Sequence, residues 1–109
     1  MKFDVKVTHE APCSRVMVSG EARLGRMLSL LQVLELDSRS WPLDRVLLDL
    51  RQHDTTLEPP EQERLLVEAA RVLARMRKVA FLVPPGRMRE CCGTRVFTSE
   101  QEALRWLAS

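Results

Sequence analysis

Val46-Leu47-Leu48-Asp49-Leu50 is a short apolar run, and it decides how we expect the chain to fold. A short apolar run without regular alternation is typical of a strand that is buried on both faces, as in parallel sheets covered by helices. A polar connection at residues 37–42 precedes the run, and a turn at residues 55–60 follows it. We therefore predict that residues 46–50 form the central strand of an α/β sheet.

Amphipathic helices are predicted on both sides of this strand in the sequence. Apolar residues at three- and four-residue spacings predict a helix over about residues 22–36. Pro59 and Pro60 suit the first turn of a second helix, where a missing amide hydrogen costs nothing. The apolar stripe of this helix is expected to consist of Leu65 or Leu66, Ala69, Val72 or Leu73, and Met76. Its charged residues fall on the opposite side: Arg64, Glu68, Arg71 and Arg75. Glu68 is expected to form ion pairs with Arg64 and Arg71.

The remaining strands lie at the two ends of the chain. Residues 3–7 and 16–18 predict an antiparallel hairpin, and residues 79–83 and 94–97 predict two further strands. Ser99 and Glu102 form a capping-box pattern that predicts a last helix. The order β-β-α-β-α-β-β-α predicts one α/β domain over residues 1–109, with a mixed, mainly parallel five-stranded sheet flanked by helices. Right-handed crossovers would bring the ends of strands two, three and four to one edge, where open α/β sheets usually hold ligands.

Composition excludes several classes of protein. The 109 residues are 45% hydrophobic, which is enough for one core, and no apolar run approaches the roughly 20 residues that span a bilayer. The N-terminus lacks a secretory signal pattern, so we expect a cytoplasmic protein with reduced thiols at Cys13, Cys91 and Cys92. His and Cys spacings typical of zinc sites are missing, and a net charge of +2 does not favour nucleic-acid binding. We expect no metal, no cofactor and no nucleic-acid partner.

Several segments of the sequence together carry a resemblance to a known family. Residues 16–21, the amphipathic helix after them, residues 46–51 and the closing residues 95–107 together resemble the STAS-like superfamily of sulfate-transporter and anti-sigma-factor-antagonist domains. The chain is most similar to the small stand-alone bacterial members. The resemblance implies a five-stranded sheet flanked by helices, and action by binding a protein partner or a small ligand rather than by a particular enzyme activity.

The sequence departs from this family at the regulatory phosphorylation site. The antagonists carry an Asp-Ser-Ser-Gly-like motif after the central strand, whereas residues 51–60 contain neither serine nor glycine. Thr55 and Thr56 stand beside Asp54 and Glu58, which would repel a phosphate, and turn formation explains both threonines. We therefore expect no phosphoserine switch.

Polar residues near the strand ends are candidates for ligand binding. An arginine-rich loop after strand four can clamp a carboxylate or phosphate, although the same residues suit a solvated loop. His53 beside Asp54 suggests an acid/base pair, but no nucleophile motif accompanies it. Arginines near Cys91 would favour its thiolate, but no residue pattern supplies a base. The candidate ligand-binding residues are Arg51, His53, Arg87, Arg89 and Arg95.

The first helix carries more apolar residues than one buried face requires. The surplus suits a ligand pocket, a partner surface or a homodimer contact, and deep burial in a small core explains it equally well. The candidate partner surface consists of Met27, Leu30, Val33 and Leu34.

The sequence thus favours a non-enzymatic binding or regulatory module that holds a protein partner or a small apolar or acidic ligand. Two alternatives stay open: a small enzyme that uses His53, Asp54 or the Cys91 region, and a structural subunit of a larger assembly.

Overall fold

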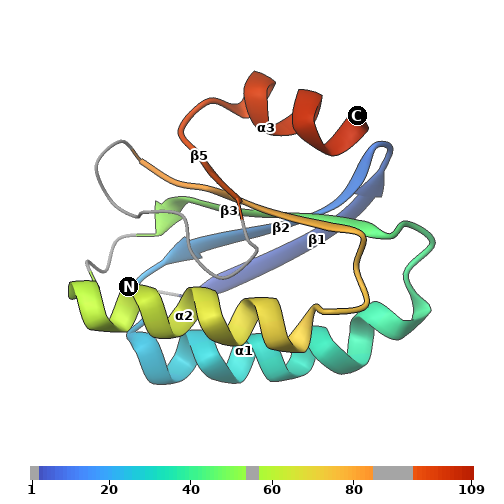
Figure 1. The fold of residues 1–109 in the computed structure, drawn as a ribbon. Coiled ribbons are helices and arrows are strands. Elements are labelled where there is room, and N and C mark those ends of the chain that lie inside the picture. Colours follow the sequence, from blue (N-terminus) through green and yellow to red (C-terminus); the bar gives the residue numbers. More distant parts are fainter. Residues whose placement is uncertain (1–2, 54–56, 85–94) are drawn as a thin grey trace.

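The computed structural model describes residues 3–53, 57–84 and 95–109, and His53 by its backbone alone. This part of the chain forms an α/β fold with a mixed five-stranded sheet and three α-helices (Figure 1). The strands are β1 (Asp4–Glu10), β2 (Cys13–Gly20), β3 (Arg45–His53), β4 (Lys78–Leu82) and β5 (Arg95–Phe97). The helices are α1 (Leu24–Asp37), α2 (Pro59–Val72) and α3 (Glu100–Ala108), with a short 3-10 turn at Ser38–Ser40.

The order of the strands in the sheet is the same as their order in the sequence, β1-β2-β3-β4-β5. The β1–β2 pair is antiparallel, and the pairs β2–β3, β3–β4 and β4–β5 are parallel. Because the crossovers through α1 and α2 both advance in the same direction across the sheet, their common handedness places both helices on one face. Figure 1 shows α1 and α2 below the sheet and α3 above it.

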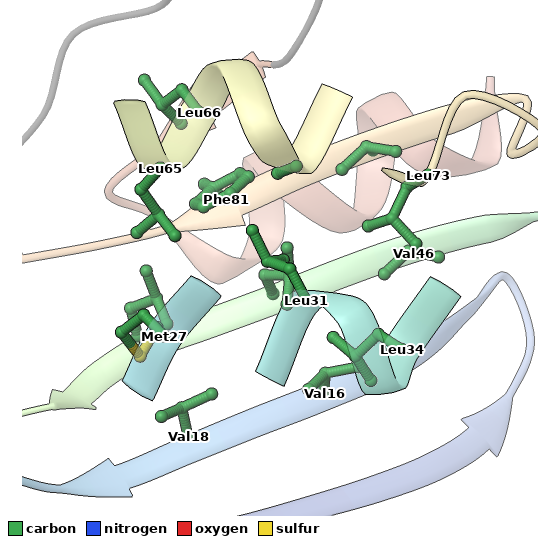
Figure 2. Packing of buried hydrophobic residues seen from close by; sticks show 14 of the residues in the cluster. Val16, Val18, Met27, Leu31, Leu34, Val46, Leu65, Leu66, Leu73 and Phe81 are labelled. Carbon is green, nitrogen blue, oxygen red and sulfur yellow. The ribbon is translucent and has the colours of Figure 1, made fainter. Parts of the chain in front are cut away.

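The main core fills the space between the sheet and the α1–α2 layer (Figure 2). Alternate residues of each strand point into it, since successive side chains of a strand face opposite sides. Phe81 of β4 is 1% exposed, and Leu31 of α1 and Leu65 of α2 are 2% and 1% exposed. Val46 and Leu48 face this core, while Leu47 faces α3, so the central strand is covered on both sides as its composition predicts.

A smaller core lies between α3 and the other face of the sheet. Ala103 and Leu107 of α3 are fully buried against Leu47, Ala80 and Leu82. The far end of α3 is held by Lys78 of β4, whose Nζ donates hydrogen bonds to the Trp106 and Ser109 carbonyl oxygens at 2.8 and 2.7 Å. These contacts fix α3 across the strands it covers.

Several predicted element boundaries need correction. The central strand β3 (Arg45–His53) extends beyond residues 46–50 at both ends, and β4 (Lys78–Leu82) begins and ends one residue earlier than predicted. The hairpin strands are longer than expected, because Glu10 pairs with Cys13 and the turn needs only Ala11 and Pro12. Helix α1 begins at Leu24 rather than near residue 22. Helix α2 ends at Val72, so Met76 lies in the connection to β4, although its side chain still packs on the core.

Two side-chain predictions for the helices can be compared directly with the structure. Arg71 pairs with Glu68, with 2.9 Å between Nη2 and Oε2, as the helical spacing predicts. Ser99 caps α3 by accepting a hydrogen bond from the Glu102 amide at 3.4 Å. None of the described helices combines the length and apolar character needed to cross a membrane.

Removing the cap of α3 should have a modest cost. We expect Ser99→Ala to lower the free energy of unfolding by about 0.5–1 kcal/mol, because the Glu102 amide loses its acceptor. Urea denaturation followed by circular dichroism measures this change. Thr98→Ala, an exposed neighbour outside the cap, serves as the control. Equal effects of the two substitutions would contradict a capping role.

Candidate functional site

An acid–base pair on β3 forms the centre of the candidate site. Asp49 and Arg51 are two residues apart, so both side chains lie on the α3 side of the sheet. The guanidinium binds both carboxylate oxygens, with Nε 3.1 Å from Oδ1 and Nη2 2.9 Å from Oδ2. The Arg51 amide also donates to Oδ1 at 3.1 Å. This bidentate arrangement holds a charged Asp49 that is only 1% exposed.

The ionisation of Asp49 follows from these contacts. Burial disfavours the carboxylate, but the hydrogen bonds from Arg51 and the charges of Arg51 and Arg15 outweigh it and hold the pKa of Asp49 below its ordinary value. The same hydrogen bonds raise the pKa of Arg51 despite some desolvation, with a further contribution from Glu100. Both groups are therefore charged at neutral pH.

Two further residues complete an arginine–carboxylate cluster that consists of Arg15, Asp49, Arg51 and Glu100. Glu100 begins α3, and its Oε1 lies 2.8 Å from Arg51 Nη2 and 3.1 Å from Arg15 Nη2. Arg15 comes from β2. One carboxylate oxygen is thus shared by two guanidinium groups that two different strands provide.

A cavity of about 240 Å³ adjoins the cluster, and we call it the α3-side cavity. Its wall is formed by Arg15 of β2, by Leu104 of α3 and by residues around the β1–β2 turn: Thr8, Glu10, Ala11, Pro12 and Cys13. Arg15 therefore belongs to both the cavity and the cluster. The lining combines apolar surface with one guanidinium and one carboxylate.

Arg15 carries an incompletely satisfied donor. Its Nη2 atom is buried and makes no hydrogen bond to the described residues, so its contact with Glu100 is an ion pair without hydrogen-bond geometry. A buried polar donor without a partner is unusual in proteins and needs a physical explanation. Because the Arg15 side chain lines the α3-side cavity, its guanidinium group is available there to an anionic ligand group.

Cys13 lines the same cavity but is not activated. Its thiol is free and 3% exposed. Burial raises the pKa of Cys13, and the nearby charge of Arg15 only partly offsets that effect. The residue therefore contributes apolar wall rather than a thiolate nucleophile at neutral pH.

A second cavity, of about 360 Å³, lies where β2 leads into α1. Phe3, Glu21, Ala22, Arg23 and Arg26 line it, and the Arg26 guanidinium lies 5.6 Å from the centre of the Phe3 ring. This is the sheet edge where the sequence predicts a ligand. In doubly wound sheets the ligand crevice forms where the strand order reverses, but the described strands follow one another without reversal. Both arginines here are exposed, so we prefer the α3-side cavity.

The sequence-predicted ligand residues do not gather at one place among the described residues. Arg51 lies in the cluster, whereas the Arg95 guanidinium packs over the rings of Phe97 and Trp106, 5.6 and 5.3 Å from their centres. His53 ends β3, where its backbone pairs with Gly20. The other predicted residues and alternatives lie outside the described residues: Asp54, Thr55, Thr56, Arg87, Arg89, Cys91 and Cys92.

The predicted partner surface on α1 needs a correction. Met27 and Leu34 are 3% and 2% exposed because they face the sheet, and they belong to the core. Leu30 is half-buried, and Val33 is 61% exposed. Of the four candidates, Val33 is the one that lies fully at the surface.

Three residues of the cluster were missed as ligand residues from the sequence. A signal for Asp49 was present, since a carboxylate inside an apolar strand with an arginine two positions later predicts a pair on one face. Arg15 and Glu100 belong to elements at opposite ends of the chain, and no local pattern links them.

The described residues define an α/β protein with an arginine–carboxylate cluster beside a small cavity. No group of three or more His, Cys, Asp or Glu side chains in this part of the chain is arranged to hold a metal ion. Comparison with models of known protein families and with curated proteins gives no match.

Proposed function

We propose that this chain is a non-enzymatic, STAS-like binding module that holds a small ligand with an anionic group and a short apolar part. The ligand occupies the α3-side cavity. Its anionic group binds the Arg15 guanidinium, and its apolar part packs against Leu104 and the β1–β2 turn.

The observation that carries this proposal is that Arg15 lines the cavity while its buried Nη2 atom makes no hydrogen bond to the described residues. A ligand carboxylate or phosphate oxygen would supply the missing acceptor and gain a charge-assisted hydrogen bond. Asp49 does not supply this acceptor, because both of its carboxylate oxygens already accept hydrogen bonds from Arg51. Arg15 is thus the guanidinium of the cluster that lines the cavity.

The volume of the cavity limits the size of the ligand. Pockets for drug-sized molecules usually measure about 300–1,000 Å³, whereas this cavity measures about 240 Å³. A short-chain or single-ring acid therefore fits better than a nucleotide or a long lipid.

The STAS-like assignment is supported by the arrangement of the elements. An opening hairpin is followed by helix–strand–helix–strand, and a final strand is then followed by a helix. A five-stranded sheet flanked by helices is also what the sequence resemblance implies. Binding without catalysis is the activity that this resemblance favours.

Hexanoate titration tests the proposed site, with neutral hexanamide as the matched probe. In ¹⁵N-labelled protein, hexanoate should shift the amides of residues 8–15 and Leu104, which surround the cavity, and hexanamide should shift them far less. We expect Arg15→Gln to weaken hexanoate binding at least about tenfold, because the charge-assisted hydrogen bond is lost.

Arg26→Gln is the control, since it removes the same charge at the other cavity. It should leave hexanoate affinity unchanged. Shifts confined to residues 21–26, or equal affinities of Arg15→Gln and the unmodified protein, would overturn the assignment.

A further inference from the structure

Glu100 bridges the two arginines of the cluster. Its Oε1 lies between Arg51 Nη2 and Arg15 Nη2, at 2.8 and 3.1 Å. We propose that Glu100 is a built-in competitor, whose carboxylate must leave Arg15 when an anionic ligand binds. This inference rests on the proposed function and adds a mechanism that regulates the same site.

The two arginines depend on Glu100 to different extents. Arg51 keeps a bidentate bond to buried Asp49 whether or not Glu100 is present. Arg15 has its ion pair with Glu100, and its Nη2 has no hydrogen-bond acceptor among the described residues. A ligand anion therefore competes with Glu100 mainly for Arg15, while Asp49 and Arg51 stay in place as a fixed frame.

Separating the Glu100 carboxylate from Arg15 should cost little free energy, because the Glu100 side chain is 40% exposed. Exposed ion pairs contribute little, since water solvates the separated charges well. Glu100 is also the first residue of α3, whereas Ala103 and Leu107 are fully buried further along the helix. The rearrangement can thus remain in the first turn of α3 and leave the helix docked on the sheet.

The experiment compares Glu100→Gln with Glu102→Gln. Both substitutions remove one negative charge from the first turn of α3, but only Glu100 contacts the arginines in the structure. We expect Glu100→Gln to bind hexanoate about three- to tenfold more tightly than the unmodified protein, because the competing carboxylate is gone. Glu102→Gln should bind with unchanged affinity.

A second measurement follows the Glu100 carboxyl group directly. In unmodified protein with ¹³C-labelled glutamate, saturating hexanoate should move the Glu100 carboxyl resonance toward that of a solvated side chain and leave the Glu102 resonance in place. Hexanamide should move neither.

The outcomes separate this inference from the proposed function. If hexanoate binds through Arg15 but Glu100→Gln and Glu102→Gln bind it equally, the competitor role is overturned and the site stands. If neither the unmodified protein nor Glu100→Gln binds hexanoate, both proposals fail. A tighter Glu100→Gln complex without movement of the Glu100 resonance would indicate general charge repulsion and also overturn competition.

Discussion

Phe81→Ala is expected to lower the free energy of unfolding by about 3–5 kcal/mol, as is usual when a large buried aromatic side chain is truncated. Phe81 is 1% exposed on β4, where it packs between the sheet and helices α1 and α2 (Figure 2). Its partners come from separate elements, so the surrounding structure cannot collapse into the space without moving a strand or a helix. The cost therefore includes both lost burial and a residual cavity.

Urea denaturation monitored by circular dichroism and by tryptophan fluorescence measures this effect. The midpoint should fall while the slope of the transition stays the same, because the substitution changes stability rather than the size of the folded unit. Val33→Ala is the control, since Val33 is 61% exposed, and its effect should stay within about 0.5 kcal/mol. A loss below about 1 kcal/mol for Phe81→Ala would contradict the packing described for the main core.

Arg51→Ala is expected to lower the free energy of unfolding by about 2–3 kcal/mol at neutral pH. The substitution leaves the buried Asp49 carboxylate without its bidentate partner, and breaking a buried ion pair usually costs about 3–5 kcal/mol. We place the cost below that range because Arg51 is itself 38% exposed and the backbone amide of residue 51 still donates to Asp49.

The effect of Arg51→Ala should depend on pH in a defined direction. The pKa of Asp49 is lowered in the folded protein, so Asp49 stabilises the fold at pH values above its unfolded pKa of about 3.9. This stabilisation is lost as the pH falls through the lower pKa of the folded state. The difference between the unmodified protein and Arg51→Ala should therefore be largest at neutral pH and shrink below about pH 4.

Urea titrations between pH 3 and pH 7 test both parts of this expectation. Arg71→Ala breaks the exposed Arg71–Glu68 pair on α2 and serves as the control, with a much smaller effect at every pH. A destabilisation by Arg51→Ala that is the same at pH 3 and pH 7 would show that Asp49 is not the reason for it.

Much of the fold could be predicted from local sequence patterns. The run at residues 46–50 predicted a strand covered on both faces, and the structure places Leu47 against α3 and Leu48 against the main core. Each predicted strand and helix has its counterpart, because apolar periodicity and caps are properties of neighbouring residues. The ends of the elements were less predictable. Cys13 lies outside the strand predicted at residues 16–18, and its pairing with Glu10 shows that it belongs to β2.

The candidate site was much less predictable, because it depends on contacts between distant segments. Arg51 was singled out from its place near a strand end, but its partners Asp49 and Glu100 were not. The apolar surplus of α1 was also ambiguous. A helical wheel places Met27, Leu30 and Leu34 in one wide apolar arc with Val33 outside it. It does not give the width of the face that the sheet covers, so buried Met27 could not be distinguished from half-buried Leu30.

The consecutive strand order has a consequence for the time at which the binding site forms. Each parallel pair joins strands that follow one another along the chain, so β1 to β4 can assemble by short-range closures as the chain emerges during synthesis. The contact of Glu100 with Arg15 instead links the last helix to the second strand. We therefore expect the nascent sheet to be folded before it can recognise a ligand, with recognition acquired only when the final helix docks.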